Sequence, residues 1–501
     1  MEVLTTSLMS LSYAVTTLVN SMLGIIRLLW QWYIVSRVAR EEFPDLALPP
    51  GDMGYPVIGE TIDLLKHGAD FYNEKLRRYG NVYKSHLLLS PCIRVVGADN
   101  VKKILMGENT LVTATWPLST RLLLGKGSLS QASGHVHKIR RKHMMYALSR
   151  ETLEGMIPFI KTCVTSVLTD WKCRRDIVTY PECKQMTFRI AAGALMGIDP
   201  TEKRIGKMHE MFVDFMNSLF TIPVNLPGFG FRKGLKAKKQ LLAILREVIA
   251  DVRKGPYTPV MMSYFKSSET MGVDPEDDLL EGVLDVLFAG HETLASTTTN
   301  SVMFLGQRKD VVQKLRDEIR HTLWTDQNAM AAGDGCDCST ERLTFQKINE
   351  LKYLNSVVNE VLRLCPPAGA GFRKVLKSFE LGGFLIPKDW IVMYSIRETH
   401  YTSPLFENPA DFNPDRWTDI DAASSDGNKQ ARFHFLPFSY GARGCIGKTY
   451  AQMVLKIFII ELVQQCEWQL CNDKPEMRFF PVPVSTDHLP IVVMTRTETV
   501  T

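Results

Sequence analysis

The chain has 501 residues, of which 45% are apolar and 23% are charged, a composition that is ordinary for a globular protein and allows two to four domains. The formal net charge is only +5, and we expect no nucleic-acid partner. The ten cysteines form no regular Cys-x-x-Cys pairs, which excludes a disulfide framework and indicates a reducing compartment. Cys336 and Cys338 lie closest together, in a polar stretch from Asp326 to Glu341 that predicts an exposed loop.

The N-terminus carries an uncharged stretch from Leu8 to Ile26, which is long enough to cross a hydrocarbon layer as a helix. Arg27 interrupts the apolar pattern, and Arg37 and Arg40 follow a second apolar stretch. Because the basic residues come after the span, the positive-inside rule places the rest of the chain in the cytosol. A tilted or interfacial helix is the alternative, since Ser, Thr and Asn weaken the span.

We divide the chain into a membrane anchor with its juxtamembrane segment, residues 1–47, and one large domain, residues 48–501. Leu48-Pro49-Pro50-Gly51 stiffens and turns the chain at this boundary. Helical periodicity dominates from about Phe71 onward. Strand patterns occur at 82–89, 92–96 and 379–396. These elements predict a mainly α fold with a small β-sheet subdomain.

Leu280 to Leu305 predicts one long apolar helix with Gly290-His-Glu292-Thr293 at its centre. Glycine inside a helix costs up to ~1 kcal/mol relative to alanine, so it needs a reason. The Thr293 hydroxyl can hydrogen-bond the carbonyl four residues back and bend the helix, which opens a groove beside Gly290. Glu292 can relay protons from solvent into that groove. The alternative is a helix kink with a solvated glutamate.

Glu360 and Arg363 lie three residues apart on one face of a predicted helix, within reach of each other. As an exposed pair they would contribute only ~0.2–0.5 kcal/mol.

The most informative stretch is the loop Phe438-Ser-Tyr-Gly441-Ala-Arg443-Gly-Cys445-Ile-Gly447, which precedes an apolar helix predicted from Lys448 to Gln465. At a helix N-terminus, unpaired N–H groups and the helix dipole stabilise a thiolate, and haem iron uses such a sulfur as a ligand. Gly441 and Gly447 let the backbone turn tightly beside a flat macrocycle. Arg443 can pair with a haem propionate, and Phe438 can shield the sulfur. In isolation, Cys445 would be read as a small buried hydrophobe.

This loop matches Phe-x-x-Gly-x-Arg-x-Cys-x-Gly at every fixed position and resembles the cytochrome P-450 family of haem-thiolate enzymes. The resemblance covers roughly Pro49 to Thr495. It implies haem b (iron protoporphyrin IX) between the long central helix and the cysteine loop, with Cys445 as the axial iron ligand. Glu292 and Thr293 then serve catalysis by delivering protons to O2 at the iron, in a groove opened by Gly290. Isomerase and dehydratase members often lack this pair.

The resemblance also implies partners and a location. Electrons would come from NADPH through a separate flavoprotein reductase. The substrate would be small and lipophilic, and the enzyme would sit in the endoplasmic reticulum membrane with its domain facing the cytosol.

Further site residues follow from the same resemblance. Glu360 and Arg363 would be joined by Arg416 in a buried structural triad. Arg373 and Arg141 would clamp the haem propionates, with His137 in the place of the family's tryptophan. The stretch around Arg141 has two alternatives, namely a solvated basic face, or a surface where Lys138, Arg140 and Lys142 steer an acidic reductase.

Three stretches resemble the retinoic-acid hydroxylase branch, cytochrome P-450 family 26: residues 48–60 with Trp116 and Arg121, residues 379–400, and residues 466–470 with 487–490. The resemblance implies ring hydroxylation of all-trans retinoic acid, which would inactivate a signalling lipid. Trp116 would pack on the polyene. Arg121 would hold the carboxylate, since a buried carboxylate needs a charge-assisted partner. A propionate contact or a surface position is the alternative for Arg121.

Two other functions remain open. Sterol or terpenoid hydroxylases of the same clan share some of these stretches, and a retinoid-sequestering haem protein without turnover is the non-enzyme alternative. An apolar segment, 220–229, followed by the basic residues 232–239, suits a loop that dips into an anionic membrane. Plain core followed by a solvated helix is the other interpretation.

Overall fold

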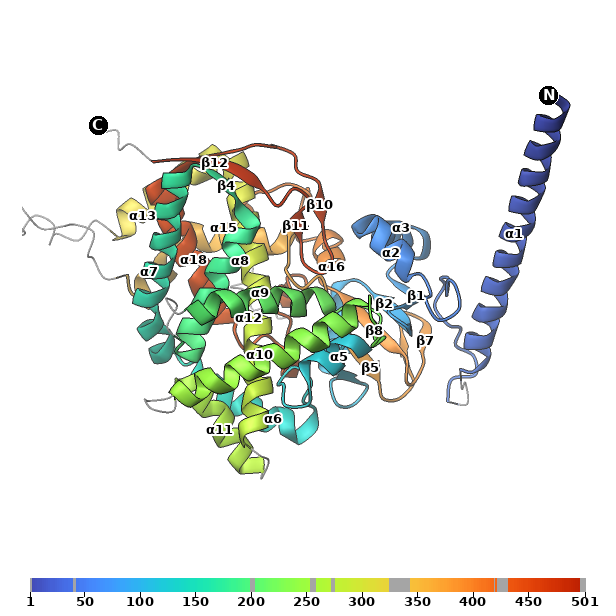
Figure 1. The fold of residues 1–501 in the computed structure, drawn as a ribbon, viewed down its shortest axis with the longest axis horizontal. Coiled ribbons are helices and arrows are strands. Elements are labelled where there is room, and N and C mark those ends of the chain that lie inside the picture. Colours follow the sequence, from blue (N-terminus) through green and yellow to red (C-terminus); the bar gives the residue numbers. More distant parts are fainter. Residues whose placement is uncertain are drawn as a thin grey trace, which may run out of the picture. The chain divides into compact units, whose positions relative to one another are not determined.

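The computed structural model describes residues 2–38, 42–198, 203–252, 258–271, 275–323, 343–418, 420 and 431–495. Helices dominate these residues and the strands form small sheets, which confirms the predicted mainly α fold (Figure 1). The chain divides into two compact units, residues 1–113 with 371–395, and residues 114–370 with 396–501. Arg40 and the predicted loop with Cys336 and Cys338 lie outside the described residues.

The first unit holds a five-stranded sheet with the strand order β1-β2-β8-β5-β3. Its strands are β1 (Val82–Leu87), β2 (Ser90–Val95), β3 (Val112–Ala114), β5 (Ala370–Val375) and β8 (Ile391–Ser395), and a separate hairpin joins β6 (Phe379–Leu381) to β7 (Phe384–Ile386). The unit's helices are α1 (Glu2–Ser36), α2 (Thr61–His67), α3 (Ala69–Tyr79) and α4 (Ala98–Met106). All three predicted strand regions are confirmed, because alternating apolar residues and turn residues mark them.

The apolar helix α1 is continuous, so Arg27 does not break it. The stretch Val15–Ser36 is long and apolar enough to cross a membrane. The Arg27 guanidinium lies 2.6 Å from the Asp52 carboxylate, which offsets its charge. A charged side chain costs nothing to helix propensity, since arginine is a good helix former.

The predicted hinge is tied to the first strand of its unit. The Lys84 N–H donates to Pro50 O at 2.8 Å, and Lys84 Nζ donates to Pro49 O at 2.9 Å. Gly51 has φ +135°, and a Cβ atom there would fall 2.1 Å from the Lys84 carbonyl oxygen. Only glycine fits this approach of backbone to backbone.

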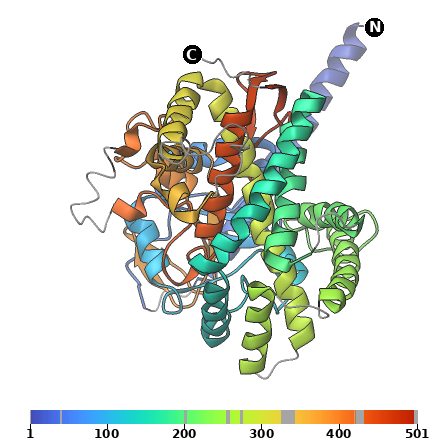
Figure 2. The same ribbon diagram turned by 90° about the vertical axis from the view of Figure 1, so that its left-hand side faces the viewer.

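The second unit is a packed set of helices. They are α5 (Leu118–Leu124), α6 (Gly134–Ala147), α7 (Arg150–Arg174), α8 (Thr179–Ile190), α9 (Lys203–Ser218), α10 (Gly230–Val252), α11 (Pro259–Met271), α12 (Pro275–Gln307), α13 (Lys309–Leu323), α14 (Phe345–Glu350), α15 (Lys352–Leu364), α16 (Arg397–Tyr401) and α18 (Lys448–Gln465). The helix α18 has the predicted bounds, and Figure 2 shows it in red beside α7 in teal. Its residues 453–463 are all buried, which explains its apolar sequence.

The central helix α12 runs further than predicted, from Pro275 to Gln307. It packs against α8, α11, α15 and α18, so its apolar residues face protein on several sides. A three-stranded sheet in this unit, ordered β4 (Asp176–Val178), β12 (Pro490–Thr495) and β9 (Cys466–Leu470), was not predicted. Its strands are three to six residues long and far apart in the chain, so no local pattern indicates their pairing.

Candidate active site

Cys445 lies in a tight loop that ends where α18 begins. The Cys445 N–H donates to Phe438 O at 2.8 Å, and the Gly444 N–H donates to Gly441 O at 3.0 Å, so the motif folds back on itself. Gly441 has φ +76°, which favours glycine as predicted. The cysteine side chain remains accessible to solvent. The loop therefore presents one thiol just before the N-terminus of a long helix.

Gly447 differs from the prediction. Its backbone angles, φ −82° and ψ 12°, are open to any residue, so this glycine is not required for the turn. A Cβ atom there would lie 4.0 Å from the Cys445 sulfur and would meet no other atom that closely. Glycine at this position leaves the flank of the sulfur uncovered.

The protonation of the Cys445 thiol reflects opposing effects. The surrounding protein desolvates the group and raises its pKa, whereas the Gly447 N–H and the charges of Arg141 and Lys448 lower it. Desolvation is the larger effect, so the helix N-terminus alone does not produce the thiolate that we predicted. A metal ion removes the proton from a coordinating thiol outright.

Two arginines and a histidine gather at this loop. Arg141 Nη1 on α6 donates to Gly444 O at 2.7 Å, and Arg443 Nη1 donates to Ala132 O at 2.7 Å. His137 is buried one turn before Arg141. Desolvation, together with the charges of Arg443 and Arg141, lowers the pKa of His137 to about 4, so its ring is neutral. The structure thus brings three predicted site residues to the thiol.

This arrangement suits a haem, which has two anionic propionates and an iron ion that needs a ligand. Propionates are anions that need cationic partners inside a protein, and the two guanidinium groups supply them. A thiol is a soft ligand that binds haem iron once deprotonated. Cys445 would hold the iron, Arg141 and Arg443 would face the propionates, and neutral His137 would lie against the macrocycle.

Thr293 and Gly290 lie on an accessible side of α12. The Thr293 hydroxyl donates to Ala289 O at 2.7 Å, the bond anticipated from the sequence. Ala289 is exposed, and Gly290 and Thr293 are half-buried. A Cβ atom at Gly290 would lie 3.8 Å from Leu195 Cδ1, an ordinary van der Waals contact, so a small side chain would fit here and the predicted groove stays a prediction.

Glu292 faces a different side of the helix, toward α8, although it directly precedes Thr293 in the sequence. Only 6% of its surface is exposed, so the solvated glutamate that was the alternative is excluded. The Tyr180 hydroxyl donates to Glu292 Oε1, and Lys184 Nζ lies 3.1 Å from Glu292 Oε2. Both partners belong to α8, and the sequence analysis did not single them out. A tyrosine and a lysine one turn apart on a helix would have been the only signal.

The predicted triad is present, with Glu360 and Arg363 fully buried and Arg416 half-buried. Glu360 accepts from Arg363 Nε at 2.8 Å and Nη2 at 2.9 Å, and from Arg416 Nε at 3.0 Å. The Asn413 N–H and Trp417 Nε1 complete its shell at 2.9 and 3.0 Å. Such a satisfied network specifies one backbone arrangement. Removing one partner of a buried ion pair costs about 3–5 kcal/mol.

A buried histidine that the sequence did not single out extends this network to the cysteine loop. His400 Nδ1 donates to Arg363 O at 2.9 Å, and the Leu436 N–H donates to His400 Nε2 at 2.8 Å. These partners place the ring proton on Nδ1. Leu436 precedes Phe438 by two residues, so His400 connects α15 to the start of the motif.

Arg373 belongs to the first unit. Its Nε lies 3.0 Å from the Glu108 carboxylate, and both side chains are buried. The charge of Arg373 is therefore balanced within its own unit, and its contact with a propionate remains a prediction.

The predicted substrate residues occupy one short helix and the residues before it. Trp116 meets Phe288 of α12 edge to face, with ring centroids 5.8 Å apart. Arg121 is exposed on α5, with the exposed Leu118 and Leu122 on the same face of the helix. This face combines apolar surface with one positive charge.

The alternative interpretation of α6 as a solvated basic face is wrong for Arg140. Arg140 is buried, and its Nη1 donates to the carbonyls of Lys126 at 3.1 Å and Ser128 at 3.3 Å. Lys138 and Lys142 are exposed. A helix turns 100° per residue, so adjacent basic residues cannot share one face.

Helical packing around an accessible thiol with cationic neighbours defines this chain as a haem-thiolate enzyme. It belongs to the cytochrome P450 family, whose sequence profile, described as Cytochrome P450, matches residues 49–493. The haem b cofactor and the use of O2 and of electrons from a reductase follow from that membership.

Named relatives place the chain within the family. It is 37% identical to Cytochrome P450 26B1 of Homo sapiens over 94% of this chain and 91% of the relative, and 37% identical to Cytochrome P450 26A1 of Danio rerio over 92% and 93%. A solved structure titled "Retinoic acid bound cyanobacterial CYP120A1" is 32% identical, with a TM-score of 0.80, over 90% of this chain and all of that one. The predicted family-26 branch is confirmed.

Proposed function

We propose that this monooxygenase hydroxylates all-trans retinoic acid on its ring. One observation carries the proposal, namely the structural neighbour solved with retinoic acid bound, which matches nearly the whole chain. The Trp116–Phe288 pair supplies aromatic surface for a polyene. The exposed face of α5 offers Arg121 to a carboxylate. Binding the carboxylate would orient the ring toward the site of oxidation. The C–H bonds of the allylic ring carbon are the weakest on the ring.

The overall reaction sets what the chain must supply. A substrate C–H bond, O2, two electrons and two protons yield an alcohol and one water. When bound, the haem supplies the iron at which O2 is reduced. The protein positions the substrate, holds the sulfur through the Cys445 loop, and delivers two protons through Glu292 and Thr293.

The test is turnover of the full chain with a reductase, NADPH and ¹⁸O2. We expect a retinoic acid product that carries one ¹⁸O atom. Sterols and terpenoids run in parallel would identify the alternative hydroxylase. A haem difference spectrum with retinoic acid but no oxidised product would instead indicate sequestration.

Thr293→Ala separates these outcomes further. We expect the variant to consume O2 without forming product in proportion, because its proton delivery is impaired. Unchanged product formation would contradict the relay.

We also propose that residues 1–47 anchor the catalytic residues 48–501 to the endoplasmic reticulum membrane, facing the cytosol. The apolar helix α1 and the basic residues that follow its first span support this topology. Protease added to sealed microsomes should degrade the catalytic domain. Full protection would contradict the orientation.

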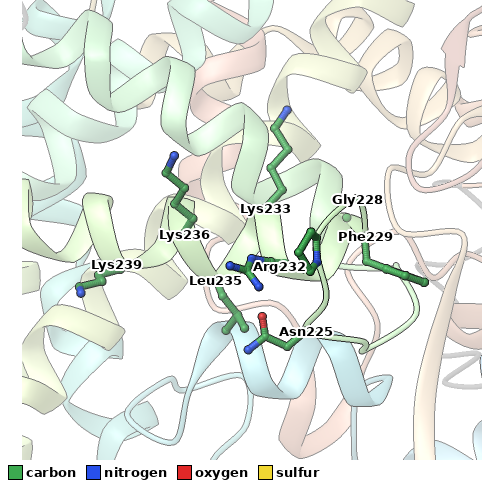
Figure 3. Close-up of a pocket in the computed structure, with 10 residues that line it drawn as sticks. Asn225, Gly228, Phe229, Arg232, Lys233, Leu235, Lys236 and Lys239 are labelled. Carbon is green, nitrogen blue, oxygen red and sulfur yellow. The ribbon is translucent and has the colours of Figure 1, made fainter.

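A second membrane contact lies at the start of α10. Arg232, Lys233, Lys236 and Lys239 line an open groove of about 850 Å³ with Asn225 and Phe229 (Figure 3). Lys233 pairs with Asp214 at 2.7 Å.

The neighbouring loop exposes the apolar Ile222, Leu226 and Phe229. Apolar side chains beside cations suit an anionic lipid surface. We expect retinoic acid turnover to be faster from anionic than from neutral vesicles, and Arg232→Glu with Lys236→Glu to remove that difference.

A further inference from the structure

The Glu292 carboxylate of α12 is held by two residues of α8. Tyr180 donates its hydroxyl hydrogen to Oε1, and Lys184 Nζ forms an ion pair with Oε2 at 3.1 Å. The side chains of Lys184 and Glu292 are 13% and 8% exposed, so both are largely covered by protein and Lys184 is the more exposed of the two. The two helices pack closely along their length.

The buried neighbour of Glu292 on its own helix cannot take the place of Lys184. His291 Nε2 lies 3.0 Å from Lys184 O, so it carries the ring proton, and Nδ1 faces Glu292 Oε2 at 3.5 Å without one. Burial, with the charge of Lys184, holds the pKa of His291 well below its usual value. His291 is therefore neutral, and among the described residues Lys184 is the cation that forms an ion pair with the carboxylate.

A buried carboxylate without a partner would be neutralised rather than remain charged. The ion pair with Lys184 supplies that partner, and the hydrogen bond from Tyr180 holds the carboxylate on the α8 side, away from the Thr293 hydroxyl, which donates to Ala289 O. To deliver a proton, the carboxylate must therefore leave Tyr180 and Lys184 and turn toward the Thr293 side of α12.

We infer that Tyr180 and Lys184 are positioning residues for catalysis, which hold Glu292 at the α8 side and connect it to solvent through the Lys184 ammonium. The inference rests on the proposed function. In each turnover, two protons cross from solvent and both end in the water molecule, the alcohol hydroxyl keeps the hydrogen of the broken C–H bond, and the two electrons arrive from the reductase. Tyr180 and Lys184 end each cycle unchanged.

The experiment compares two oxidants on Lys184→Met, Tyr180→Phe and Lys184→Arg. With O2, NADPH and reductase, the protons must be delivered by the protein. With hydrogen peroxide, substrate and oxidant give alcohol and water, and both protons arrive with the oxidant. The measurements are product formed per NADPH consumed, the peroxide-driven rate, and the KM for retinoic acid.

We expect Lys184→Met and Tyr180→Phe to lower product per NADPH by about tenfold, while peroxide-driven hydroxylation and KM stay within about twofold. Lys184→Arg should restore most of the coupling, because it keeps the charge. Glu182→Gln is the matched control, since it breaks an ion pair on the same helix, with Arg174 at 2.9 Å, that does not involve Glu292.

Unchanged coupling in both Lys184→Met and Tyr180→Phe would overturn the inference. So would parallel loss of both activities without rescue by Lys184→Arg, because that pattern indicates a purely structural role. If Lys184→Met does not fold, Tyr180→Phe and Lys184→Arg still decide the question. No hydroxylated retinoid from the unaltered chain with either oxidant would overturn the proposed function and, with it, this inference.

Discussion

At the scale of single residues, the two glycines that flank Cys445 have different roles. Gly441 adopts φ +76°, where an L-residue costs about 1–2 kcal/mol, whereas Gly447 adopts angles open to all residues. We expect Gly441→Ala to lower the unfolding midpoint and the haem content, and Gly447→Ala to leave the unfolding midpoint nearly unchanged. Thermal unfolding and the Soret band of the reduced, carbon monoxide-treated protein measure both. Equal effects would contradict this distinction.

We propose that Arg121 binds the substrate carboxylate from an exposed, otherwise apolar face of α5. Arg121→Ala should raise the KM for retinoic acid by about tenfold, the order expected for one charge-assisted hydrogen bond. The matched control is the methyl ester of retinoic acid, which has no charge to bind. The variant and the unaltered chain should oxidise the ester alike. An equal rise in KM for the acid and the ester would indicate a packing role.

At the scale of elements, α6 carries two functions on two faces. His137 and Arg140 lie on its buried face, the half-buried Arg141 donates to Gly444 of the cysteine loop, and its exposed face carries Lys138 and Lys142. We propose the exposed face as a docking surface for the acidic reductase.

Lys138→Glu with Lys142→Glu should slow reductase-dependent turnover several-fold and weaken its dependence on salt, because steering acts through charge. Peroxide-driven hydroxylation should not change. Lys474→Glu, at another exposed position, is the control. A double variant with normal salt dependence would place the docking surface elsewhere.

At the scale of the whole molecule, hydrogen bonds run from the Glu360 triad through His400 to the cysteine loop. Burial lowers the pKa of His400 to about 4, from an ordinary value of 6.5. The folded state therefore holds His400 neutral, while the unfolded chain binds a proton below pH 6.5. Its contribution to stability is complete above pH 6.5 and is lost as the pH falls toward 4, by about 3 kcal/mol.

His400→Asn should accordingly be less stable than the unaltered chain at pH 7.5 and should lose less stability between pH 6.5 and 4. Unfolding midpoints over this range measure the difference. The haem content at each pH serves as a control for loss of cofactor. Identical pH profiles would mean that His400 does not cause the loss of stability between pH 6.5 and 4.

Sequence patterns correctly predicted the elements that depend on residues close together in the chain. The bounds of α18, the strand regions and the Thr293–Ala289 hydrogen bond all depend on residues within a few positions of each other. The motif around Cys445 likewise identified the cofactor and family, since its residues are contiguous in the chain.

The sequence by itself determined the class of chemistry, because a thiol, its turn and its helix are contiguous in the chain. Tertiary structure alone decided which groups surround those residues. Arg140 is buried rather than exposed, Arg373 pairs with Glu108, and Glu292 is held by Tyr180 and Lys184 from a helix more than 100 residues earlier in the chain. The physical reason is that burial and pairing of charge depend on neighbours in space, which no local periodicity encodes.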